Sequence, residues 1–79
     1  MKILFFAQLK LVTGCEEASI DSDEPLTQEA LWALLLERFP GLSMHRSHVR
    51  LAKNWEYAMT EDMYSRGDEI ALIPPVSGG

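Results

Sequence analysis

Apolar residues fall into a few short runs along this chain, and their spacing distinguishes strands from a helix. The first run, residues 2–9, is rich in aromatic and branched side chains and predicts a strand buried on one face or both. The last run, residues 69–74, has the same character, and Pro74 and Pro75 end it because proline cannot continue a sheet. Since they are the most apolar segments, we expect these two runs at the centre of a sheet.

A single helix is predicted between these two runs. Thr27 has a side chain preferred at the N-cap, and Pro40–Gly41 provides a stop signal. Apolar residues between these signals recur at spacings of three and four. This spacing predicts a buried stripe of Leu31, Leu34, Leu35 and Phe39, widened on one side by Trp32 and Leu36.

Shorter, more polar segments connect these elements. Residues 10–14 fit one helical turn that ends at its glycine, and residues 16–21 fit an edge strand pairing back on the first strand. Residues 49–54 alternate in part as a strand does. Asn54–Trp55 then predicts a tight turn into a short strand at residues 56–59.

The resulting order is strand, strand, helix, strand, short strand and strand, which predicts an α+β domain. With the first and last strands paired in parallel, the helix lies in a right-handed connection on one side of the sheet. We therefore expect a β-grasp, with a mixed sheet of four to five strands and one main helix packed on one face.

Composition narrows the classes of partner. The net charge of −5 argues against nucleic acid, because phosphate binding needs a surplus of lysine and arginine. The same charge fits a partner with a basic groove, or simply keeps a small protein soluble. No apolar run approaches the ~20 residues of a membrane span, and a single cysteine cannot form an internal disulfide. These features predict a cytoplasmic protein that binds no membrane.

Few side chains point to chemistry within the domain. Cys15 has acidic neighbours and no adjacent base that would activate a thiol. His45 and His48 are three residues apart, but no third ligand is near, and we expect exposed histidines and no metal site. The acidic loop at residues 21–25 lacks the spacing of a calcium-binding loop.

The C-terminal segment carries the most specific pattern. Residues 67–79 read Gly-Asp-Glu, then an apolar strand, then Pro-Pro-Val-Ser-Gly-Gly. This segment resembles the C-terminus of the small subunit of molybdopterin synthase, a family of ubiquitin-like sulfur carriers. Residues 3–7 resemble the family's first strand and residues 26–32 its helix start. Asn54 stands where the family has an asparagine before its penultimate strand.

The resemblance extends over essentially the whole chain, with three departures. Lys53 stands where an apolar residue is more usual, and Trp55 is bulky for its turn. Tyr64 occupies a position more often taken by leucine. These departures leave the predicted fold unchanged and affect the details of partner contact.

The resemblance implies a function for the C-terminus. A separate ATP-dependent activating enzyme would adenylate the carboxylate of Gly79, and sulfur from a donor protein would replace AMP to leave a thiocarboxylate. The large synthase subunit would receive this tail and pass its sulfur to cyclic pyranopterin monophosphate, building the dithiolene of molybdopterin. By this resemblance the chain is no enzyme on its own, binds no cofactor itself, and joins a heterotetramer of two large and two small subunits.

The residue types of the tail suit this role. We expect a β-grasp domain at residues 1–75 and a flexible Gly-Gly tail at residues 76–79. Pro74 and Pro75 fix their own φ angles and aim the tail, and glycine has no side chain to obstruct a narrow channel. Hydrogen bonds to a partner's groove are expected from the tail residues Val76, Ser77 and Gly78.

Docking also requires a surface, and the resemblance points to Phe6, Tyr57 and Ile73. Their strand positions would bring them together on the sheet face away from the helix, where an apolar patch marks an interface. The alternative for each of the three is a place in the core.

Other functions also fit a Gly-Gly terminus. One is a sulfur carrier for thiamine or another thiolated product, and another is a ubiquitin-like protein modifier that carries no sulfur. The plainest alternative is a frayed end made of small residues. The Pro-Pro-Val-Ser-Gly-Gly segment and the apolar last strand favour the molybdopterin carrier.

Overall fold

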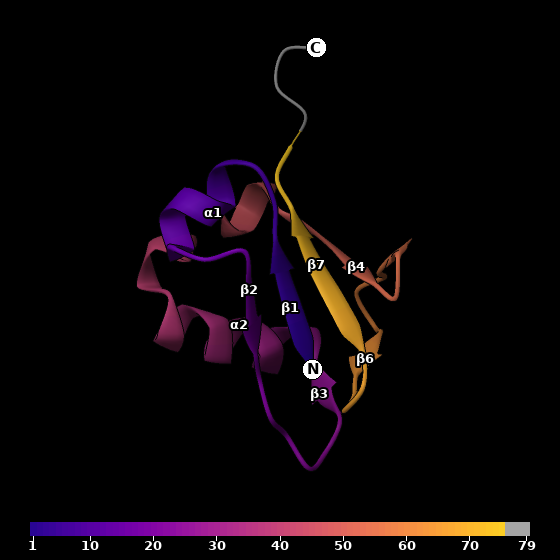
Figure 1. The fold of residues 1–79 in the computed structure, drawn as a ribbon. Helices are drawn as coiled ribbons and strands as arrows, with labels where there is room; N and C mark the ends of the chain where they lie inside the picture. Colours follow the sequence, from indigo (N-terminus) through magenta and orange to yellow (C-terminus); the bar gives the residue numbers. More distant parts are fainter. Residues whose placement is uncertain (76–79) are drawn as a thin grey trace.

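The computed structural model describes residues 1–75 and contains a mixed sheet with its helices on one side (Figure 1). The five strands lie in the order β2-β1-β7-β4-β5. β1 and β7 pair in parallel at the middle of the sheet, and the pairs β1–β2, β4–β7 and β4–β5 are antiparallel. The predicted β-grasp is confirmed. The strands are β1 (Lys2–Phe5), β2 (Glu17–Ser19), β4 (Arg50–Lys53), β5 (Glu56–Tyr57) and β7 (Glu69–Ile73).

The main helix α2 (Gln28–Arg38) packs on one face of this sheet. Its N-cap is Thr27, as predicted, and the Thr27 hydroxyl accepts a hydrogen bond of 3.1 Å from the Ala30 amide. The core between helix and sheet contains fully buried side chains from α2, β1 and β7, among them Leu31, Leu35, Ile3, Phe5, Ile70 and Leu72.

The predicted burial of one residue in the helical stripe, Leu34, is wrong. Leu34 is 38% exposed, whereas Trp32 is 3% exposed and belongs to the core. Successive residues turn by about 100° around a helix. The buried face is centred between Leu35 and Trp32, so Leu34 is turned toward solvent.

The first strand is shorter than predicted, because the chain turns sharply after Phe5. Ala7 has φ 51° and ψ −132°, and the Leu9 amide donates a hydrogen bond of 3.0 Å to the Phe6 carbonyl. The helix α1 (Gln8–Thr13) then follows where residues 8 and 9 were expected in the strand. It ends at Gly14, which has φ 80°, in agreement with the predicted stop.

A second small sheet was not predicted. β3 (Leu26–Thr27) and β6 (Met63–Tyr64) pair antiparallel beside α2. Two short 3₁₀ helices, η1 (Pro40–Met44) and η2 (Arg46–His48), lead from α2 to β4. A two-residue strand has too few positions for an alternating pattern to be recognised.

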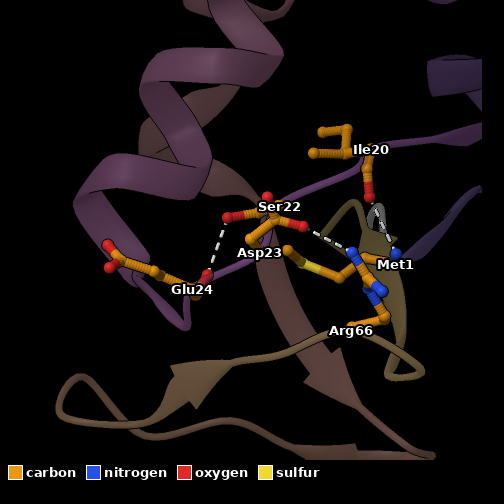
Figure 2. A network of polar contacts seen from close by, with 6 residues as sticks. All are labelled: Met1, Ile20, Ser22, Asp23, Glu24 and Arg66. Carbon is orange, nitrogen blue, oxygen red and sulfur yellow. Dashed lines mark hydrogen bonds and ion pairs between the residues drawn. The ribbon is translucent and has the colours of Figure 1, made fainter.

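Polar contacts hold the loop that connects β2 and β3, as Figure 2 shows. The Met1 ammonium group donates a hydrogen bond of 2.8 Å to the Ile20 carbonyl. The Arg66 guanidinium contacts the Asp23 carboxylate at 2.6 Å. Both side chains of this ion pair are largely exposed, so we assign it a small contribution to stability.

Candidate functional site

An apolar hollow of about 640 Å³ lies beside the end of β7. We call it the β7 hollow and define it by the large side chains that form its walls. They come from three places in the chain: the turn after β1, the β4–β5 hairpin, and the end of β7 with the two prolines that follow. These wall residues are Phe6, Trp55, Tyr57, Ile73, Pro74 and Pro75.

Small side chains form the floor of the β7 hollow. Ala52 of β4 pairs with Ala71 of β7 on one side and with Tyr57 of β5 on the other. Both alanines are only 5% exposed, although they point away from α2. Because side chains alternate between the two faces of a strand, larger residues at these positions would fill the hollow from below.

The structure brings the predicted surface residues Phe6, Tyr57 and Ile73 together around this hollow. Phe6 is 36% exposed and Tyr57 is 59% exposed, whereas Ile73 is half-buried. The Arg50 guanidinium lies 4.0 Å from the centre of the Tyr57 ring, which restrains the ring at the edge of the hollow. None of the three lies in the core on the helix side. Their role in binding a partner stays a prediction.

The β4–β5 hairpin turn is tight and strained. Asn54 has φ 51° and Trp55 has φ 70°, so both residues are left-handed, as in a type I′ turn. This conformation costs an ordinary L-residue roughly 1–2 kcal/mol, and glycine is usual in the second position. Trp55 is nevertheless 70% exposed and gains little packing within the described chain.

Hydrogen bonds fix this turn to the start of β7. The Asn54 backbone amide donates to the Glu69 carbonyl at 2.7 Å, and the Glu69 amide donates to Asn54 Oδ1 at 3.0 Å. The Asn54 side-chain amide also donates to Asp68 Oδ1 at 3.0 Å. The position of Trp55 is therefore set relative to the strand that leads to Pro74.

Sequence reasoning did not assign Trp55, Ala7 or Gln8 to the site. All three line the β7 hollow. The bulk of Trp55 in a tight turn was a visible signal for it. Ala7 gave none, since glycine is the residue expected where φ is positive.

The tail predicted at residues 76–79 lies outside the described residues. The two prolines before it are described, and Pro74 is half-buried whereas Pro75 is exposed. Both are part of the wall of the β7 hollow.

Two titratable groups are perturbed by their surroundings. The pKa of Asp68 is lowered from its ordinary value of 3.8, chiefly because the Ser65 backbone amide donates to it at 2.8 Å, and also because Asn54 donates to it. Burial raises the pKa of the Tyr64 phenol, and the negative charge of Asp62 adds to this shift. Neither group lines the β7 hollow.

The weaker candidates do not form a site. Cys15 is half-buried and has its sulfur 3.8 Å from the Thr13 hydroxyl. His48 is exposed as expected, whereas His45 is half-buried. Within residues 1–75, no group of three or more histidine, cysteine, aspartate or glutamate side chains is placed to hold a metal ion. A membrane-crossing helix is also absent from this range.

A mixed sheet whose first and last strands pair in parallel beneath one helix defines the ubiquitin-like class of β-grasp domains. The chain belongs to the ThiS family, whose model matches residues 3–79. The predicted relationship to sulfur carriers is confirmed by this match and by the relatives that follow.

Two curated relatives are called molybdopterin synthase sulfur carrier subunits. The one from Caenorhabditis elegans is 37% identical, and the alignment covers 100% of this chain and 96% of the relative. The one from Homo sapiens is 34% identical and the alignment covers 100% of this chain and 93% of the relative.

Solved structures agree with these relatives. The fold matches SAMP1 from Haloferax volcanii with a TM-score of 0.84 at 31% identity, over 99% of this chain and 97% of that one. It also matches a chain in the complex of subunits 1 and 2 of the molybdopterin-converting factor from Helicobacter pylori. That match has a TM-score of 0.73 at 28% identity and covers 99% of this chain and 96% of the other.

Proposed function

We propose that this protein is the sulfur carrier subunit of a molybdopterin synthase and donates sulfur from its C-terminal Gly79. The observation that carries the proposal is the similarity, at 34–37% identity over the full length of this chain, to relatives with that name. The family match extends to residue 79 and therefore includes the Gly-Gly pair.

The carboxylate of Gly79 needs activation before it can carry sulfur. An ATP-dependent activating enzyme joins the carboxylate to AMP and releases pyrophosphate. Sulfide released from a donor protein then attacks the acyl carbon, forms the carbon–sulfur bond and expels AMP, which leaves a thiocarboxylate. The sulfur of this group is a nucleophile held on a protein arm, so its effective concentration at a bound acceptor is high. This chain itself binds no cofactor, and ATP is used by the activating enzyme.

The large subunit of the synthase is the proposed acceptor of the tail. It binds cyclic pyranopterin monophosphate and supplies the catalytic side chains, and two transfers of sulfur build the dithiolene. The expected assembly has two large and two small subunits. A partner for this chain is supported by the Helicobacter pylori complex, in which a similar chain is one of two subunits.

The β7 hollow is the proposed docking surface for the large subunit. Phe6, Tyr57 and Ile73 provide apolar contact next to the prolines from which the tail extends. Burying such side chains yields roughly 25 cal/mol for each Å² of apolar surface removed from water. Docking at the hollow would aim the backbone of Val76, Ser77 and Gly78 into the partner's groove.

The carrier proposal is tested by the intact mass of the protein. The full chain is incubated with its activating enzyme, ATP and a sulfur source, and a variant that lacks Gly79 is treated in parallel. We expect a gain equal to sulfur minus oxygen, located on Gly79, in the full chain only. If the full chain forms the adenylate but never gains sulfur, it is not a carrier.

A second candidate function is protein modification, because SAMP1, the small archaeal modifier protein 1 of Haloferax volcanii, is 31% identical. A modifier would join Gly79 to amino groups of other proteins. Mass spectrometry of peptides from the source cell distinguishes the two functions. Branched tryptic peptides that carry residues 67–79, the segment after Arg66, support modification. Their absence alongside a thiocarboxylate supports the carrier alone.

A further inference from the structure

We propose that Trp55 is a specificity-determining anchor that inserts into an apolar socket on the large synthase subunit. This role rests on the proposed function. It makes Trp55 a binding residue, although neither the fold nor the chemistry of the tail requires a tryptophan there. Three observations support it: the conformation of Trp55, its exposure, and its position on the β7 hollow.

The conformation of Trp55 conflicts with its local sequence preference. It occupies the second position of a type I′ turn with φ 70°, where glycine would be unstrained. Its side chain is 70% exposed, so packing within residues 1–75 does not offset the strain. A residue that breaks a local rule without a gain in the folded chain is often functional. Contact with a second protein would supply the missing gain.

The position of Trp55 ties it to the tail. It shares the wall of the β7 hollow with Tyr57, Pro74 and Pro75. A protein that surrounds the tail therefore extends over the hollow and reaches the indole ring. Tryptophan is among the residues that contribute most to binding when they are enclosed at an interface.

The turn holds Trp55 ready for binding. Asn54 makes hydrogen bonds with Glu69 and Asp68, and these bonds fix the turn to β7. Because this turn is already ordered, the backbone at Trp55 loses little freedom on binding, which lowers the entropic cost of association. A flexible turn would require the partner to order it.

The charge around Trp55 defines the chemistry of the socket. Glu56 follows it directly and is exposed, whereas the Arg50 guanidinium lies against Tyr57 at the edge of the hollow. The matching surface on the large subunit is an apolar socket with a basic group placed to meet Glu56. The large subunit is the preferred occupant because a similar chain is found in the complex of subunits 1 and 2 of the molybdopterin-converting factor from Helicobacter pylori. The activating enzyme is the competing occupant.

The test measures the affinity of variants for both partners by titration calorimetry. Trp55→Gly removes the indole and relieves the backbone strain. Trp55→Asn also removes the indole, and asparagine is a second residue that tolerates a positive φ. Met44→Ala is the matched control, because Met44 is 81% exposed and does not line the hollow. Thermal unfolding of each variant verifies that it is folded.

We expect both Trp55 variants to bind the large subunit at least about tenfold more weakly, equivalent to ~1.4 kcal/mol. Met44→Ala should bind as the wild type does, and all variants should be adenylated at the normal rate. Unchanged affinity of Trp55→Gly, while the wild type binds, overturns the anchor and leaves the carrier function intact. An equal loss of affinity for the activating enzyme would show that Trp55 does not distinguish between the two partners, and would overturn its role in specificity. A wild type that does not bind the large subunit contradicts the proposed function itself.

Discussion

The side-chain amide of Asn54 donates a hydrogen bond of 3.0 Å to the carboxylate of Asp68 and so connects two turns that are far apart in sequence. One turn joins β4 to β5 and carries Trp55, and the other precedes β7. Asp68 also accepts a hydrogen bond from the Ser65 backbone amide at 2.8 Å. This pair therefore determines how the hairpin side of the β7 hollow is placed relative to the strand that leads to the tail.

Replacing Asn54 should weaken the fold in two distinguishable steps. Asn54→Gly keeps the left-handed backbone and loses the side-chain hydrogen bonds, and we expect a loss of about 1 kcal/mol in unfolding free energy. Asn54→Ala also strains the backbone at φ 51°, so its loss should be about 2 kcal/mol. Urea unfolding measures both. Equal unfolding free energies of the two variants would show that the backbone at position 54 does not strain an alanine.

The acid sensitivity of the protein should depend on Asp68. Hydrogen bonds lower the folded pKa of Asp68 below 3.8, so the ionised carboxylate stabilises the folded state. This contribution is fully present above the unfolded pKa and is lost as the pH falls through the folded pKa. We expect the unfolding free energy of the wild type to fall steeply below about pH 4. Asp68→Asn should be less stable at pH 7 and less steep below pH 4. Parallel profiles for the two proteins would contradict this role.

Ala7→Gly should stabilise the protein. Ala7 has φ 51°, a region in which glycine has no steric cost, and nothing else about the tight turn after β1 changes. We expect a gain of up to about 1 kcal/mol, or roughly 4–8 °C in melting temperature for a domain of this size. Ala18→Gly in β2 is the control and should destabilise, since glycine weakens a strand.

Tyr64→Phe should also stabilise the protein. The Tyr64 side chain is fully buried, and its hydroxyl has no hydrogen-bond partner within residues 1–75. Removing an unsatisfied buried hydroxyl while keeping the ring should add about 1 kcal/mol to the unfolding free energy. The ring contact with the Lys53 ammonium group, 5.8 Å from the ring centre, is retained. A loss of stability would mean that the hydroxyl is satisfied by solvent or by the remaining residues.

The same variant should change the alkaline limit of stability. Burial raises the folded pKa of Tyr64 above 10.0, so ionisation of this phenol favours the unfolded state. The unfolding free energy of the wild type is therefore undiminished below the unfolded pKa and falls as the pH rises through the folded pKa. Tyr64→Phe has no such group. Its melting temperature should fall less than that of the wild type above pH 10.

The centre of the fold could be predicted because its signals are local and redundant. The runs that form β1 and β7 are apolar almost throughout, and the helix has both an N-cap residue, Thr27, and a stop. The turn at Asn54–Trp55 was also predictable, since asparagine tolerates the left-handed conformation. These features agree with one another, which is why the β-grasp followed from the sequence.

The remaining features depend on tertiary structure. The end of β1 could not be placed because Ala7 has no preference for the conformation that it adopts. Leu34 fits the helical spacing, and only the rotation of α2 on the sheet shows that it faces solvent. The site residues Phe6, Tyr57 and Ile73 came from family resemblance, and their grouping around one hollow became visible only in the structure.

Single-turnover sulfur transfer tests the proposed function most directly. The thiocarboxylated protein is mixed with the large synthase subunit and cyclic pyranopterin monophosphate, and both the mass of the carrier and the pterin product are followed. We predict that the sulfur on Gly79 is lost while molybdopterin is formed, at two carriers consumed for each product. Retention of the thiocarboxylate in this mixture, with its consumption by a thiazole synthase instead, would contradict the assignment.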